Sequence, residues 1–479
     1  MNLALFVAAG LLVNVSAQAE RAGTSTPAGA SVNPASSARQ AIAAAPELPW
    51  WEGLGDAQLR ELIQRALQQN ADVQAAALRS TQAEANAWQQ LAPTLPVLRV
   101  QASGNGAPTE SLGFQFGGIP RAPGAEEPPD IYYTGSAFLV AQANIDLGRS
   151  ITAWSASRKE ATAVSHDADA LAASLALQVA QTYFDLQTAR AQVAVLREQQ
   201  QTNQSLLSLT ELRFSRGTAD GLDVLQQKQQ VAASGTRIPP AVAREQILTQ
   251  TLRVLVGSPP NDTLPISSMR LPAPRGIPSE FDLEALEERI PELRAAAERV
   301  RAAKDRVRSA QLAFLPTLGV NGQVGQQGIA IDEVNSQNVW GVGASLSLPL
   351  LEGGRKWSAW KSAEAALASA EAQQKQLRLR VQQNVANARA QDDGLIAQTQ
   401  AAQEQTSAAT DAMRLAQERY AAGLSNYQAL LLAVNASQNA QLALLDTQRQ
   451  SIQARIRYLN AIGGAWSASL ATASSRSTP

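Results

Sequence analysis

The chain contains no cysteine among its 479 residues. A chain without cysteine forms no disulfide, no thiolate nucleophile and no cysteine-ligated metal site. It also lacks an attachment point for an acyl chain, so we expect no lipid anchor. The single histidine, His166, lies among polar residues, which indicates a solvated helix face. We therefore expect no catalytic residues, no metal site and no cofactor, and hence a protein that is not an enzyme.

Charged residues are scarce as well. They make up 17% of the chain, against about 25% in a typical globular domain. The 40 Lys and Arg residues balance 41 Asp and Glu residues, and a formal net charge of −1 argues against a nucleic-acid partner. Beyond the N-terminus no run of about 18 apolar residues occurs, so no membrane-spanning helix is predicted. Alanine, glutamine and leucine dominate instead, which favours long helices that pack through small side chains.

The N-terminus predicts export from the cytoplasm. A short apolar run from Leu3 to Val13 precedes Ala17-Gln18-Ala19, which matches an A-x-A cleavage site. We expect a signal peptide over 1–19 and a flexible lead over 20–46 that is rich in Ala, Ser, Thr and Pro. Because the usual positive n-region is missing, the alternatives are a buried or disordered terminus, or a misassigned start codon.

The most informative feature that is present is an internal repeat. Three segments of the first half recur in the second: 91–95 as 314–318, 143–149 as 349–355, and 213–217 as 419–423. Two tandem copies of one unit are therefore predicted. Gly217 lies 69 residues after Gly148, and Gly423 lies 69 residues after Gly354, so this part tolerates no change of length. The first copy has 17 more residues between Leu95 and Gly148 than the second has between Leu318 and Gly354, and we assign the extra residues to a loop.

The segment of constant length predicts a helical rod. It contains no proline or glycine between Arg149 and Gly217, and its apolar residues recur at helical spacing. A helix of about 65 residues is roughly 100 Å long. A second rod is expected from Arg355 to Ala422. Each rod leads through a turn into a returning helix, over 222–256 and 424–462.

Other helical segments follow from periodicity and from proline. One long helix is expected over 59–91, with Asp56 as its N-cap. Pro239 and Pro240 break the first returning helix, because proline lacks the amide donor and clashes with the preceding turn.

Each copy also predicts two β-strands, since apolar residues alternate with small or polar ones. The alternation runs over 98–103 and 139–147 in the first copy, and over 318–324 and 340–348 in the second. A membrane barrel has this pattern, with apolar residues toward lipid and polar ones toward a watery lumen. An ordinary antiparallel sheet over a soluble core has it too.

Four strands are too few for a membrane barrel, which needs about eight. If the strands lie in a membrane, several chains must combine, and three would supply about twelve strands. The helical hairpins would then form a second cylinder below the strands. A barrel of strands that continues into a cylinder of helices would form a conduit across the periplasm.

Several motifs, taken together, resemble the TolC-like outer membrane efflux proteins. The residues that carry the resemblance are Trp50-Trp51-x-x-Leu54-Gly55-Asp56, the LAPTL and FLPTL joints, Leu350-Leu351-Glu352-Gly353-Gly354-Arg355 and Arg419-Tyr420-x-x-Gly423-x-x-x-Tyr427. Ile238-Pro239-Pro240 and the closing Gly463-Gly464-Ala465-Trp466 are similar to the NodT/OprM branch. The resemblance covers about residues 47–466.

This resemblance implies a mixed α/β membrane protein, a homotrimer with a twelve-stranded β-barrel in the outer membrane and a coiled-coil α-helical barrel in the periplasm. It implies a passive channel of a tripartite system for multidrug efflux, in which a periplasmic adaptor protein and an inner-membrane pump of the RND type are the partners. The alternatives are a soluble periplasmic coiled-coil scaffold or, within the family, a metal-cation efflux or type I secretion channel.

The resemblance also places candidate residues at the helical tips. The turns that meet the adaptor contain Arg213, Gly217, Asp220, Arg419, Gly423 and Tyr427. The candidates for the pore constriction are Asp223, Gln428 and Leu432. Related sequences carry carboxylates after the second turn, but here those positions are Ala429 and Leu432, so an acidic ring would have to come from Asp220 and Asp223. Helix capping is the alternative role for both carboxylates.

The expected organisation has six parts. After the signal peptide and the lead, repeat 1 covers 47–257, a linker covers 258–278, repeat 2 covers 279–466, and a disordered tail covers 467–479.

Overall fold

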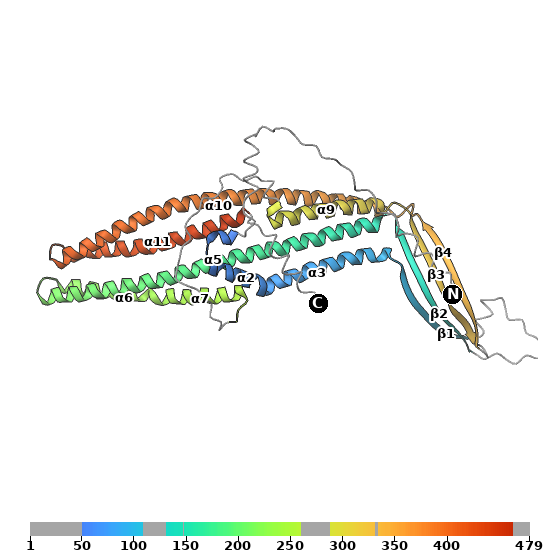
Figure 1. Cartoon of the computed structure of the whole chain (residues 1–479), viewed down its shortest axis with the longest axis horizontal. Coiled ribbons are helices and arrows are strands. Elements are labelled where there is room, and N and C mark those ends of the chain that lie inside the picture. The colour runs from blue at the N-terminus through green and yellow to red at the C-terminus, as the bar shows by residue number, and fades with distance from the viewer. Residues whose placement is uncertain (1–49, 109–130, 147, 260–287, 331–333, 463–479) are drawn as a thin grey trace, which may run out of the picture. The chain divides into compact units, whose positions relative to one another are not determined.

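The computed structural model describes residues 50–108, 131–146, 148–259, 288–330 and 334–462 (Figure 1). Contacts divide the chain into residues 1–46 and residues 47–479, and all the elements described below lie in the second part. The signal peptide, the lead, the loop between the first two strands and the C-terminal tail lie outside the described residues, as does nearly all of the expected linker.

The duplication seen in the sequence is a duplication of structure. In the first copy, α3 (Ala71–Leu91) leads into β1 (Val97–Pro108) and β2 (Ile131–Asp146), and then into the rod α5 (Arg149–Ser215). In the second copy, α9 (Pro291–Leu312) leads into β3 (Thr317–Ala330) and β4 (Val334–Ser347), and then into the rod α10 (Arg355–Ala421). Both rods have 67 residues, which confirms the predicted equality of length.

The returning helices follow the rods. In the first copy they are α6 (Gly221–Thr236) and α7 (Ile238–Val256), separated only by Arg237, so the predicted break before Pro239 is confirmed. In the second copy α11 (Tyr427–Ala461) is unbroken. The rod α5 packs against α3 and α9 along one part of its length and against α6, α7 and α11 along another (Figure 1). The rod α10 packs against α9 and α11.

The strands form one antiparallel sheet in the order β1-β2-β3-β4. Register places Val100, Leu139, Val324 and Trp340 in one row across all four strands. Their exposed fractions are 78%, 42%, 55% and 77%, so this apolar face is uncovered. The opposite face carries polar residues in rows such as Ser103, Ser136, Gln327 and Gln337. A sheet over a soluble core would bury its apolar face, which this sheet does not do.

None of the helices within the described ranges combines the length and the apolarity needed to cross a bilayer.

The single helix expected over 59–91 is wrong, because Asn70 divides it into α2 (Ala57–Gln69) and α3. Asn70 has an extended backbone, with φ −69° and ψ 127°. Its side-chain oxygen accepts a hydrogen bond from the Asp72 amide at 2.9 Å, and its side-chain nitrogen donates to the Leu255 carbonyl at 3.1 Å. The asparagine thus caps one helix while tying the break to the end of α7.

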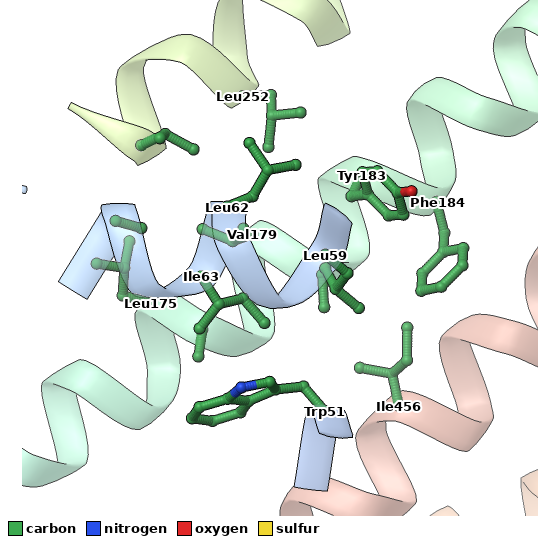
Figure 2. Close-up of a cluster of buried hydrophobic side chains, with 14 of the residues drawn as sticks. Trp51, Leu59, Leu62, Ile63, Leu175, Val179, Tyr183, Phe184, Leu252 and Ile456 are labelled. Atoms are coloured by element: carbon green, nitrogen blue, oxygen red, sulfur yellow. The ribbon is translucent and has the colours of Figure 1, made fainter. Parts of the chain in front are cut away.

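The largest buried cluster lies where α2 crosses the rod α5 (Figure 2). It takes Trp51 from η1 (Trp50–Leu54), Leu59 from α2 and Val179 from α5, and it reaches Leu252 of α7 and Ile456 of α11. Elements of both copies therefore meet in one core. We refer to this cluster as the α2 core.

One polar contact fixes α2 on the rod. Asp56 accepts hydrogen bonds from the amides of Gln58 at 2.9 Å and Leu59 at 3.1 Å, so it is the predicted N-cap. The second oxygen of the same carboxylate accepts from the Tyr183 hydroxyl at 2.8 Å. Burial, and then the Asp56 carboxylate, raise the pKa of Tyr183 well above its ordinary value, so the phenol remains a donor.

We expect Leu59→Ala to destabilise the protein by about 2–5 kcal/mol, because Leu59 is fully buried and its loss leaves a cavity. Thermal unfolding followed by circular dichroism in detergent would measure the loss. The matched control is Gln64→Ala, an exposed position of the same helix, which should change stability by less than about 0.5 kcal/mol. Equal melting temperatures for both variants would contradict the assignment of the α2 core.

The helical tips as the candidate functional site

The first tip turn joins α5 to α6 through a helix C-terminus closed by glycine. The amide of Thr218 donates to the Arg213 carbonyl at 2.9 Å, and the Gly217 amide donates to the Phe214 carbonyl at 2.9 Å. Gly217 has φ 72°, a left-handed conformation that residues with a Cβ adopt at a cost. This arrangement of a left-handed glycine with paired hydrogen bonds is a Schellman-type cap.

The second tip turn, between α10 and α11, repeats this geometry. The Leu424 amide donates to the Arg419 carbonyl at 2.8 Å, and the Gly423 amide donates to the Tyr420 carbonyl at 3.0 Å. Gly423 has φ 78°. The equal spacing of the two glycines in the sequence thus corresponds to one turn built twice.

The two predicted carboxylates of the first turn form a capping box. Asp220 precedes α6 and accepts a hydrogen bond from the Leu222 amide at 3.2 Å. Asp223 accepts from the Asp220 amide at 3.4 Å. In the second copy Asn426 does the capping, since it accepts from the Ala429 amide at 3.0 Å. Capping therefore accounts for both carboxylates within a single chain.

Arg213 connects the two turns, a role that the sequence did not reveal. Its guanidinium lies 4.2 Å from the centre of the Tyr420 ring, donates to the Tyr420 carbonyl, and donates to the Thr218 carbonyl at 3.0 Å. A guanidinium over an aromatic ring is attracted to the negative ring face. Arg419, at the matching position of the second copy, is exposed.

Tyr427 lies inside the helix packing and not on the surface of the chain. Its side chain is 3% exposed, and its hydroxyl donates to the Gln227 side-chain oxygen at 2.9 Å. Burial, and then the Asp223 carboxylate and Tyr420, raise the pKa of Tyr427 to about 12. The phenol therefore stays neutral, and remains a donor, at any physiological pH.

A line of buried amides continues from Tyr427 and links the two copies. Gln227 of α6 donates to the Asn203 carbonyl of α5 at 2.8 Å, and Gln438 of α11 donates to the Asn203 side-chain oxygen at 3.2 Å. Gln199 of α5 donates to the Gln438 carbonyl at 3.1 Å. We name Gln199, Asn203, Gln227 and Gln438 the amide ladder. All four side chains are buried, and the only hint in the sequence was glutamine and asparagine at helical spacing.

The remaining candidates are at the surface of the chain. Gln428 and Leu432 of α11 are exposed, Leu432 to 61%. Asp223 is half-buried and faces the Tyr427 environment, whereas Gly217 and Gly423 are exposed. The tips thus combine a buried linking set with an exposed set that is available to other molecules.

Within the described ranges, no group of three or more His, Asp or Glu side chains could hold a metal ion. The expectation of a solvated His166 needs correction. Its side chain is only 20% exposed, and its ring nitrogen lies 3.5 Å from an Asp169 oxygen, because a helical turn brings residues three apart together.

Comparison with known proteins identifies the family. A family model described as "Outer membrane efflux protein" matches residues 62–258 and 283–464. "Pyoverdine export outer membrane protein OpmQ" of Pseudomonas putida is 27% identical over 448 residues, covering 91% of each chain. "Outer membrane protein OprJ" of Pseudomonas aeruginosa is 27% identical over 436 residues, covering 88% of each chain.

Solved structures show the same fold. The outer-membrane channel OprN superposes with a TM-score of 0.77 at 23% identity, covering 87% of this chain and 92% of that one. The outer membrane protein VceC of Vibrio cholerae gives a TM-score of 0.75 at 25% identity, covering 88% of this chain and all of that one. The family consists of efflux channels and not of enzymes, and the two repeats, the sheet and the rods described above fit it. The chain belongs to the outer membrane efflux protein family.

Proposed function

We propose that three copies of this chain close a twelve-stranded barrel in the outer membrane, through which small molecules pass without being transformed. One chain supplies four strands, in the order β1-β2-β3-β4. Membrane barrels need about eight or more strands, and bacterial ones have even numbers of them. Three chains give twelve strands if β1 of one copy pairs with β4 of the next.

The single observation that carries this proposal is the uncovered apolar face of the sheet. Val100, Val324 and Trp340 are more than half exposed, which water disfavours and lipid accepts. The polar face then lines an aqueous lumen. The helices α3, α5, α9 and α10 continue the wall from the sheet, and rods of 67 residues extend it by roughly 100 Å.

Partners and cargo follow from the relatives. These include a pyoverdine exporter, the "Multidrug resistance outer membrane protein MdtP" of Escherichia coli and "Toxin and drug export protein A" of Aggregatibacter actinomycetemcomitans. We assign this chain a periplasmic adaptor protein and an inner-membrane pump of the RND type as partners, and drugs or other toxic small molecules as cargo. The lumen is a passage, and the choice of cargo belongs largely to the pump.

The tips are the proposed meeting point with the adaptor. Gly217, Asp220, Arg419 and Gly423 are exposed there, and Arg213 holds the two turns together. Asp223, Gln428 and Leu432 are the candidates for the constriction. Tyr427 contributes from inside the packing, through its bond to Gln227.

The assembly is tested first by its mass. The protein extracted with detergent from separated outer membranes should have a native mass near three times the 50.7 kDa of the chain, less any signal peptide. Native mass spectrometry would measure it. A monomer or dimer recovered from the soluble periplasm would contradict the barrel.

The turn glycines should be needed for export. Gly217→Val or Gly423→Val forces a β-branched residue to a left-handed φ, at a cost of about 1–3 kcal/mol. We expect lowered tolerance to exported drugs in cells that depend on this channel, at an unchanged amount of protein in the outer membrane. The control is Gly394→Val, since Gly394 lies within α10 with open space around it. Unchanged tolerance in both turn variants would remove the tips from the proposal.

The hydroxyl of Tyr427 should hold α11 to α6. Tyr427→Phe leaves the Gln227 oxygen buried without its donor, at a cost of about 1–3 kcal/mol. We expect at least tenfold faster hydrogen exchange, to order of magnitude, in the first turns of α6 and α11. Tyr420→Phe is the matched control, because within the described residues the buried Tyr420 hydroxyl has no hydrogen-bond partner. Equal exchange in the two variants would argue against this link.

A further inference from the structure

A basic hollow lies where the rods begin beside the sheet. It measures about 470 Å³ and is lined by residues of α3, α5, α9 and α10 and by the residue that caps α9. These four helices meet the strands at one end (Figure 1). Four of its lining residues are cationic, namely Arg149, Arg306, Arg355 and Lys356, and no carboxylate lines it. We call these four residues the cationic collar.

The repeat shows which side of the wall this hollow occupies. Arg149 and Arg355 are the first residues of the two rods. Two residues further on, Ile151 and Trp357 are 58% and 57% exposed. Because a helix turns by about 100° per residue, these apolar side chains point away from the arginines. Exposed apolar side chains beside the uncovered apolar face of the sheet suit the bilayer, so the arginines lie on the aqueous side.

The positions of the tryptophan residues also place the edge of the bilayer at the junction between the rods and the sheet. Trp88 and Trp154 lie with ring centres 6.0 Å apart near the start of the α5 rod, and Trp357 and Trp360 lie near the start of α10. Four of the eight tryptophans of the chain thus gather at the junction. Tryptophan concentrates at membrane–water interfaces.

The collar keeps an excess of positive charge after its ion pairs are counted. Glu352 lies 2.8 Å from Arg355 and 3.8 Å from Lys356, and Glu160 lies 2.9 Å from Arg306. Glu160 is shared with Arg299 at 3.6 Å. Two carboxylates therefore serve four collar cations.

Arg149 is the member with the most capacity to bind. Within the described residues no ion pair and no hydrogen bond of its guanidinium is present, whereas its backbone carbonyl accepts from the hydroxyls of Thr152 at 2.8 Å and Ser309 at 3.2 Å. The nearby Asp146 carboxylate is occupied by Ser150, through a 2.9 Å bond from its amide and a bond from its hydroxyl. A free guanidinium fork is suited to a carboxylate, phosphate or sulfonate group.

We propose that the cationic collar lines the duct and binds anionic groups of solutes in transit, as small carboxylates, phosphates or sulfonates. The proposal rests on the trimeric barrel, which places three collars around one lumen. Cations that line one hollow act together, because a Debye length of about 8 Å at physiological salt spans several side chains. A confined set of like charges raises the local concentration of counter-ions. The collar thus favours anionic cargo at the junction between the helical barrel and the β-barrel.

Binding of inorganic tripolyphosphate to the purified full chain in detergent, measured by calorimetry, tests the collar directly. We expect salt-sensitive binding that is weakened about tenfold or more by the double variant Arg149→Gln, Arg306→Gln. The matched control is Arg301→Gln with Arg414→Gln. It removes two exposed arginines that lie outside the hollow and pair with carboxylates of their own helices. Equal affinity in the two double variants, or no binding by the parent protein, would overturn the proposal.

Two further measurements separate the collar from the channel. Under a potassium chloride gradient across a planar bilayer, the parent trimer should prefer anions, and the collar variant should lose most of that preference. A conducting parent trimer without anion preference overturns the collar and leaves the channel intact, whereas a monomeric native mass overturns the channel itself. Co-purified phosphatidylglycerol that is lost only in the collar variant would assign the hollow to lipid headgroups and overturn its place in the duct.

Discussion

Backbone hydrogen bonding at the two outer strands is the constraint on which the remaining architecture depends. In a single chain β2 and β3 are paired on both sides, but β1 and β4 each have one edge without a partner among the described strands. Water can satisfy such an edge, whereas a bilayer cannot, so an edge in lipid must be paired. The uncovered apolar face and the two open edges therefore both favour a sheet that lies in a bilayer and pairs with further strands. In the proposed assembly, neighbouring copies would pair with these two edges.

The equal length of the two rods fixes how the two tips are oriented relative to each other. Since both begin at a joint with the sheet and both end in the same glycine turn, a length difference of even one residue would rotate one tip against the other by about 100°. Two rods of 67 residues keep the tips in phase. The contacts between the copies differ along the rods. The α2 core is apolar and draws on both copies, while the tips are joined by the amide ladder, by Arg213 and by a small cluster around Tyr420 and Tyr427.

Much of this fold was predictable because its signals are local. A span without glycine or proline between Arg149 and Gly217 predicts a helix whatever surrounds it, and the alternation in β3 and β4 predicts strands. The break at Asn70 was missed because the residues on both sides continue the helical period. The interruption depends on a bond from Asn70 to Leu255, 185 positions away in the sequence. The amide ladder and the cationic collar were missed for the same reason, since each joins residues that only the tertiary fold brings together. For the tips, the sequence could indicate the turns but not that Tyr427 is buried.

The α2 core has a mechanical consequence. It clamps the rod α5 near its middle, at Val179 and Tyr183, where η1, α2, α7 and α11 converge. A long, stiff helix that is held by packing at its centre can pivot only about that point. Between the α2 core and the tips the hydrophobic clusters are smaller, and buried polar side chains such as Gln199, Asn203 and Thr210 lie among them, so separating the helices there would expose less apolar surface. On the other side of the α2 core, α5 begins directly after β2 and is thereby connected to the sheet. A displacement of the tips would therefore be resisted at the α2 core, and the end of α5 beside the sheet would move less than the end beside the turn.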